Sequence, residues 1–186
     1  MDLAKAKTDA ATLGQKFQEM QMNSRQYQKC ERCTDYDIEG CQEFCTIKHR
    51  NWLASFHDIL VSRSWVQLKK TFEIYKEKHG RNVAADIPKV FDYWSWYKKA
   101  LLSIYQYTMD SNGFFAEALA RDMYWFDRDA SWAHVYSTAR VFAWRSEIDL
   151  GDIATAFSNK YRMTLSEYIM TYVRGDSKST LFSILH

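Results

Sequence analysis

The four cysteines of the chain lie within sixteen residues and carry its clearest metal-binding signal. They are Cys30, Cys33, Cys41 and Cys45, spaced Cys-x2-Cys-x7-Cys-x3-Cys. Zn²⁺ binds four thiolates in a tetrahedron, and Cys-x2-Cys is a common half of such a site. The spacing therefore predicts a zinc site, with His49 in reserve. Two other readings stay open: two disulfides, or four free thiols in a mobile loop.

Side chains that could support catalysis are not grouped in any pattern of a known enzyme class. The chain has neither a Gly-x-Ser-x-Gly nor a His-Glu-x-x-His motif. Six scattered glycines form no phosphate-binding loop, which excludes P-loop and dinucleotide-binding proteins. The net charge of +2, from 25 basic and 23 acidic residues, gives no reason to expect nucleic acid as a partner. We expect a binding protein and not an enzyme.

Helical periodicity covers most of the 186 residues, and one proline is too few for the turns of an all-β fold. Capping boxes are predicted where Ser64 precedes Gln67, where Ser146 precedes Asp149, and where Thr164 precedes Glu167. The helical pattern breaks in the Cys-rich segment and in an aromatic loop at 124–133. The expected helices lie near 2–20, 52–63, 65–79, 82–87, 97–107, 134–144 and 177–185, and others open at Ser111 or Asn112, at Ser146 and at Thr164.

An internal repeat relates the two halves of the chain at an offset of 82 residues. Arg63-Ser64 recurs as Arg145-Ser146, and Tyr75 recurs as Phe157. A period this long indicates a repeated unit of several helices, and not a coiled coil. We expect an all-α protein of two five-helix repeats, at 1–108 and 109–186, with a Cys-rich insert at 18–50 in the first.

The repeat resembles the last two of the four repeats of the annexin family. Arg145-Ser146-Glu147-Ile148-Asp149-Leu150 resembles the start of helix C in the fourth repeat, and Ile59-Leu60-Val61-Ser62-Arg63-Ser64 resembles the third. The resemblance implies that the Cys-rich insert lies in the first A–B loop. It also implies that each repeat lacks its usual partner repeat. We therefore expect self-association or binding of a missing annexin half.

Calcium is the ion through which annexins bind membranes, and the resemblance places its ligands in the A–B loop and on a later carboxylate. Here the first loop aligns with Lys48-His49-Arg50-Asn51, which has no glycine and carries two cations. The acid position falls on Asp92 in the first repeat and on Tyr172 in the second. Calcium requires six to eight oxygen ligands, so both sites are expected to be degenerate.

Aromatic residues make up 16% of the chain and concentrate in two loops that the resemblance places on the convex, membrane-facing side. Tryptophan and tyrosine favour the membrane interface. These side chains are expected to contact a membrane or a partner protein, although packing against neighbouring helices would also account for them. They are Trp94, Trp96, Trp125, Phe126 and Trp132.

The expected function is binding to anionic phospholipid membranes with calcium dependence weakened or lost. The alternative is a cytoskeletal or scaffold protein that uses the annexin fold for protein contacts, as the divergent giardins do, with a zinc-stabilised insert. The N-terminus lacks an apolar signal segment, and no apolar run approaches the ~20 residues of a membrane helix. We expect a cytoplasmic protein, peripheral at the membrane or cytoskeleton.

Overall fold

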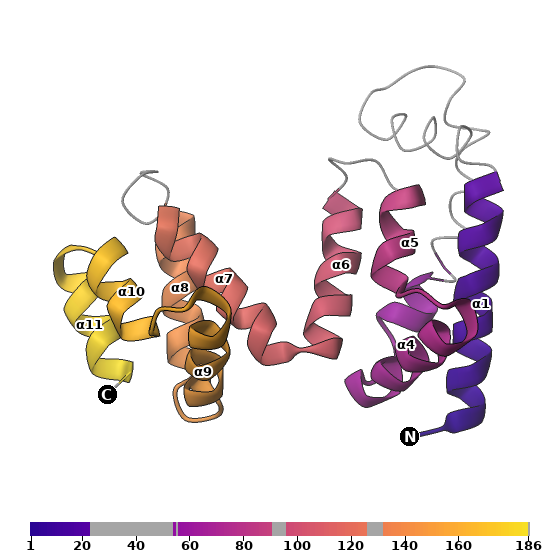
Figure 1. The fold of residues 1–186 in the computed structure, drawn as a ribbon, viewed down its shortest axis with the longest axis horizontal. Coiled ribbons are helices and arrows are strands. Elements are labelled where there is room, and N and C mark those ends of the chain that lie inside the picture. The colour runs from indigo at the N-terminus through magenta and orange to yellow at the C-terminus, as the bar shows by residue number, and fades with distance from the viewer. Residues whose placement is uncertain (23–53, 55, 91–95, 126–131, 186) are drawn as a thin grey trace, which may run out of the picture. The chain divides into compact units, whose positions relative to one another are not determined.

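The computed structural model describes residues 1–22, 54, 56–90, 96–125 and 132–185, and all regular elements in these ranges are helices. The all-α prediction is confirmed for this part of the chain. The molecule divides into two compact units, Met1–Met109 and Asp110–His186 (Figure 1). They are called unit 1 and unit 2 below.

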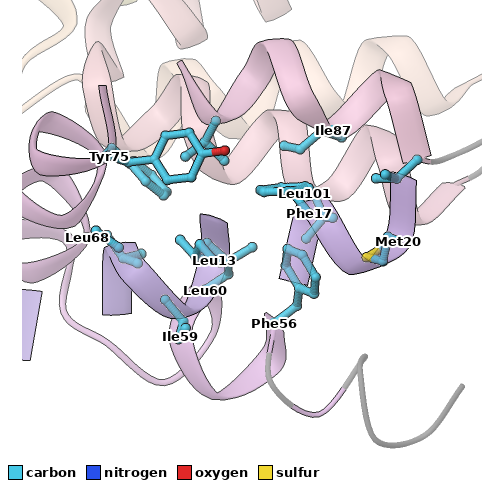
Figure 2. Packing of buried hydrophobic residues seen from close by; sticks show 14 residues of the cluster. Leu13, Phe17, Met20, Phe56, Ile59, Leu60, Leu68, Tyr75, Ile87 and Leu101 are labelled. Carbon is cyan, nitrogen blue, oxygen red and sulfur yellow. The ribbon is translucent and has the colours of Figure 1, made fainter. Parts of the chain in front are cut away.

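Unit 1 is built around the long helix α1 (Leu3–Met22), which packs along α4 (Trp65–His79). Two further helices, α5 (Val83–Val90) and α6 (Trp96–Met109), pack against each other, and residues 56–60 are also helical. Their apolar faces form one core, in which the ring of Phe17 meets that of Phe56 at a centroid distance of 5.0 Å (Figure 2).

The stripe that begins at Ala6 continues through Phe17 to Met20, which is 1% exposed. Helix α1 therefore extends to Met22 and occupies the first residues of the insert predicted at 18–50. Pro88 lies within α5, which continues for two residues beyond it. The prediction that this helix ends at Ile87 is thus wrong, since Ile87 and Val90 are both buried and hold the last turn against the core.

Only one of the two hydrogen bonds of the capping box predicted at the start of α4 is formed. The Ser64 hydroxyl accepts a hydrogen bond from the backbone N–H of Gln67 at 3.3 Å, as predicted. The Gln67 side chain does not return to the cap. Its amide donates to the carbonyl of Asp2 at 2.7 Å, and its oxygen accepts from the Asp2 N–H at 2.9 Å. The second half of the predicted capping box is wrong because this bond ties α4 to the start of α1.

The described residues of unit 2 form five helices with a core of their own. Helix α7 (Ser111–Trp125) packs on α8 (Trp132–Arg145), α9 (Leu150–Tyr161) and α10 (Leu165–Tyr172). Helix α11 (Gly175–Leu185) packs on α8 and α10. No helix in the described ranges of either unit is long and apolar enough to cross a membrane.

Of the two capping boxes predicted in unit 2, one is formed and one is not. Thr164 and Glu167 form the reciprocal capping box, with N–H···O distances of 2.7 and 3.2 Å. The box predicted from Ser146 to Asp149 is absent, because these residues form a turn and α9 begins at Leu150. The carboxylate of Asp149 is held instead by the guanidinium of Arg145, with Nε at 2.6 Å.

The interiors of the two units differ at positions that are 82 residues apart. In unit 1, the fully buried carboxylate of Asp86 accepts hydrogen bonds from Tyr75 Oη at 2.6 Å, Arg81 Nε at 2.7 Å and Lys89 Nζ at 2.8 Å. Burial alone would raise the pKa of Asp86, but these three donors outweigh it and the pKa lies below its ordinary value.

In unit 2, Phe157 and Tyr168 occupy the positions equivalent to Tyr75 and Asp86, and their ring centroids are 5.1 Å apart. An aromatic contact thus replaces the buried carboxylate and its phenol donor. The repeated arginine keeps a carboxylate partner in both units but contacts the first helix of each unit differently. Arg63 pairs with Asp9 of α1 at 2.9 Å, whereas Arg145 binds Asp149 and also lies over the ring of Phe115 in α7, 4.7 Å from its centroid.

Candidate membrane-facing site

One end of each unit gathers the helix termini that lead into the aromatic loops. In unit 1, the ends of α1 and α5 and the start of α6 lie at the same end (Figure 1). In unit 2, the ends of α7 and α10 and the starts of α8 and α11 lie together in the same way (Figure 1). The described part of the candidate site therefore consists of the first and last turns of these helices.

Among the described residues at this end of unit 1, Trp96 is the most exposed large apolar side chain. It is the first residue of α6, and 81% of its surface is accessible to solvent. The ammonium of Lys99, one turn later, lies 4.6 Å from the centroid of the indole ring. An exposed indole beside a cation is suited to the boundary between acyl chains and phosphate groups. Trp94 and Asp92 lie outside the described residues.

Tyr124 and Trp125 form the corresponding aromatic surface of unit 2, at the end of α7. Their exposed fractions are 38% and 44%, and their rings pack edge to face at 5.3 Å. Tyr124 also packs on Tyr172 at 6.0 Å, and Tyr172 packs on Tyr168 at 4.3 Å. A continuous set of rings thus connects the interior of unit 2 to its exposed end. Phe126 lies outside the described residues, as does the side chain of Trp132, the first residue of α8.

Asp122 fixes the base of this aromatic surface and was not identified from the sequence. It is buried and accepts hydrogen bonds from Ser137 Oγ of α8 at 2.5 Å and from Arg121 Nε at 3.0 Å, with His134 Nδ1 at 3.4 Å. Burial opposes the charge, but these bonds outweigh burial and lower the pKa of Asp122. The carboxylate therefore ties the end of α7 to the start of α8. An acid three residues after Leu119 on the apolar stripe was the signal in the sequence.

The predicted metal ligands fall almost entirely outside the described part of the chain. Cys30, Cys33, Cys41 and Cys45 lie there, so the zinc prediction stays a prediction. Among the residues that the structure describes, no three His, Cys, Asp or Glu side chains are grouped to hold a metal ion. Tyr172, which the resemblance assigns to the acid position of the second calcium site, presents a phenol packed between two other rings. A phenol in that packing does not supply the bidentate carboxylate of a calcium site.

Comparison with known proteins identifies relatives of a single family. The chain is 30% identical to annexin A13 of Mus musculus over 132 residues, which are 71% of this chain and 39% of that protein. It is 31% identical to annexin A7 of Homo sapiens over 130 residues, which are 70% of this chain and 25% of that protein. The chain thus spans well under half the length of these relatives. No family model matches it.

Solved structures give the same result for the fold. A K16A mutant of annexin A8 covers the whole chain with a TM-score of 0.68 and 26% identity, and the match spans 47% of that structure. Annexin III also covers the whole chain, with a TM-score of 0.67 and 25% identity over 47% of its length. The paired units of this chain are therefore similar to about half of each of these proteins.

Proposed function

We propose that this chain, which belongs to the annexin family, binds phospholipid membranes through the exposed aromatic ends of its two units. The observation that carries the proposal is Trp96, 81% exposed at the first turn of α6 with Lys99 beside its ring. Tyr124 and Trp125 offer a second aromatic surface at the corresponding end of unit 2. Indole rings that enter the interface and cations that meet lipid phosphates favour anionic membranes.

Vesicle sedimentation with single substitutions tests this assignment. Burying half of an indole removes about 100 Å² from water, which at about 25 cal/mol/Å² is worth about 2 kcal/mol. Trp96→Ala and Trp125→Ala should each weaken binding to phosphatidylserine-containing vesicles by about tenfold or more. Phe182→Ala is the control, because Phe182 is 38% exposed but lies in the last turn of α11, away from the start of that helix at the aromatic end. Equal losses for all three variants would refute the assignment.

Calcium dependence is what family membership implies, and we propose that it is weakened or lost in this chain. Tyr172 supports the proposal for unit 2, since it replaces the expected acid. Binding to the same vesicles should survive EGTA. If binding vanished in EGTA and returned with micromolar calcium, the proposal would be wrong, and Asp92→Ala would then identify whether the first repeat supplies the ligand.

Each unit corresponds, in this proposal, to one annexin repeat, with the boundary near residue 108. Such a chain self-associates or binds a missing annexin half, and the contact could serve a cytoskeletal or scaffold role. Exposed apolar side chains support this, among them Val66 at 65% and Ile148 at 70% exposure. Sedimentation velocity at tens of micromolar tests self-association, and a monomer throughout that range would contradict it.

The Cys-rich insert is proposed to bind one zinc ion through its four thiolates. Helix α1 ends before these cysteines and packs on a core that residues of α1, α4, α5 and α6 already build. Removing zinc should therefore leave most of the helical signal intact. Elemental analysis and the intact mass of the protein purified without reductant, compared with the fully reduced value, test the proposal. A protein without zinc and with a mass two or four units low would contain disulfides instead.

A further inference from the structure

Equivalent helix starts in the two units each expose a branched apolar side chain. Val66 lies in the first turn of α4 and is 65% exposed. Ile148 lies 82 positions later, in the turn before α9, and is 70% exposed. The residues just beyond them, Leu68 and Leu150, are buried in their respective cores. The sequence therefore repeats both the inward leucine and the outward apolar residue.

The surface around Val66 is basic. Val61 and Trp65 flank it, with exposed fractions of 67% and 50%. Lys69 and Lys70 follow one turn later on α4, on the same side of the helix as Val66. Lys70 makes an i,i+3 contact with Glu73 at 3.0 Å, and such exposed pairs are weak and easily exchanged. These five residues, from Val61 to Lys70, are called the basic surface.

The surface around Ile148 is acidic. Glu147 and Asp152 are exposed beside it, and Trp144 contributes an indole that is 69% exposed. Trp144 carries the guanidinium of Arg140 on its ring at 5.5 Å, which places that cation at the edge of the surface. Trp144, Glu147, Ile148 and Asp152 are called the acidic surface.

The sign of the charge changes at one matched position, where Lys70 of unit 1 corresponds to Asp152 of unit 2. At a second, the neutral Trp65 corresponds to Glu147. The two surfaces thus share an apolar centre just before an equivalent buried leucine but carry opposite charges beside it. Two basic surfaces repel each other, as do two acidic ones, whereas one of each pairs opposite charges around a joint apolar contact.

We propose that the basic surface of one molecule docks onto the acidic surface of a second copy of this chain. This inference deepens the proposed self-association and rests on it. Val66 and Ile148 with the neighbouring indoles form the buried centre, since Trp is among the residues that contribute most to protein interfaces. Lys69 and Lys70 face Glu147 and Asp152 at the rim, where opposite charges set orientation and exclude the wrong pairing.

Charge reversal on either surface tests the pairing. One variant carries Lys69→Glu and Lys70→Glu, which makes both of its surfaces acidic. The other carries Glu147→Lys and Asp152→Lys, which makes both surfaces basic. Each variant alone should be a monomer in sedimentation velocity at concentrations where the wild type associates. An equimolar mixture should associate again, because only the mixed contact pairs opposite charges.

A control variant with Lys76→Glu and Lys78→Glu carries the same change of charge at the other end of α4. It should associate as the wild type does, and circular dichroism should show native helix content in all variants. A monomeric wild type would refute self-association itself. A wild type that associates while the reversed variants also associate, or while their mixture stays monomeric, would refute only the assignment of the surfaces.

Discussion

Replacing Asp86 with asparagine should destabilise unit 1 by about 2 kcal/mol at neutral pH. The carboxylate is fully buried and joins α4 to α5 through Tyr75, Arg81 and Lys89. Hydrogen bonds to charged groups contribute about 1.5–3 kcal/mol. The Arg81 and Lys89 side chains are 41% and 48% exposed, so water screens their part and the lower half of that range applies.

The pH dependence distinguishes loss of charge from loss of shape. The folded-state pKa of Asp86 is lowered, so its carboxylate contributes stability above the unfolded-state value, near ~4. That contribution is lost as the pH falls through the lowered pKa. The difference in unfolding free energy between wild type and Asp86→Asn should therefore be largest at pH 7 and decrease progressively below about pH 4.

Urea unfolding followed by circular dichroism, at pH 7 and again below about pH 4, measures the difference in unfolding free energy between wild type and Asp86→Asn. Tyr75→Phe is the matched comparison, because it introduces the residue that unit 2 has at the equivalent position, Phe157. It removes one donor and leaves both cations, so it should cost about 1 kcal/mol. An Asp86→Asn variant within about 0.5 kcal/mol of wild type at pH 7, a typical effect of a neutral surface change, would refute this account of the junction.

Four further single substitutions and one double variant follow from local geometry. Arg162 ends α9 with φ of 57°, and Gly80 ends α4 with φ of 66°, both in the left-handed region that favours glycine. In thermal melts, Arg162→Gly should therefore raise the unfolding free energy by about 0.5–1 kcal/mol, and Gly80→Ala should lower it by about 1 kcal/mol. Thr164→Ala removes the oxygen that caps α10 and should cost about 1 kcal/mol in urea unfolding; no loss would mean that solvent replaces the cap. Gly14→Ala places a methyl group against the imidazole of His79, so it should cost about 1–3 kcal/mol, and His79→Ala should relieve that cost in the double variant.

Local sequence signals predicted the helices well where their partners are also local. Gly80 and the pair Thr164 and Glu167 act within one helical turn, and both predictions hold. In the two capping boxes that do not form fully, the side chain expected to complete the box makes another contact instead. Gln67 binds Asp2, which is 65 residues away, and Asp149 is held by Arg145 of the preceding helix. A capping pattern does not reveal such competitors.

The residue types of the candidate site were predictable, but their local structure was only partly so. The resemblance placed Trp96 and Trp125 in loops, whereas the structure places them in the first turn of α6 and the last turn of α7, because the helical hydrogen bonding extends to both residues. Asp122 and Asp86 were missed, since their partners lie 15 and 11 residues away and meet them only after the helices pack. A single carboxylate on an apolar helical stripe was the available signal for both.

The different junctions of the two units make the choice of denaturant informative. In unit 1, the buried carboxylate of Asp86 joins α4 to α5 through charge, while Phe157 with Tyr168 joins α9 to α10 through rings at the equivalent place in unit 2. Urea and guanidinium both weaken apolar burial, but guanidinium chloride is also a salt that screens ion pairs. The junction of α4 with α5 should thus lose more stability than that of α9 with α10 when urea is exchanged for guanidinium chloride, so the stability cost of Asp86→Asn should be smaller in guanidinium chloride than in urea.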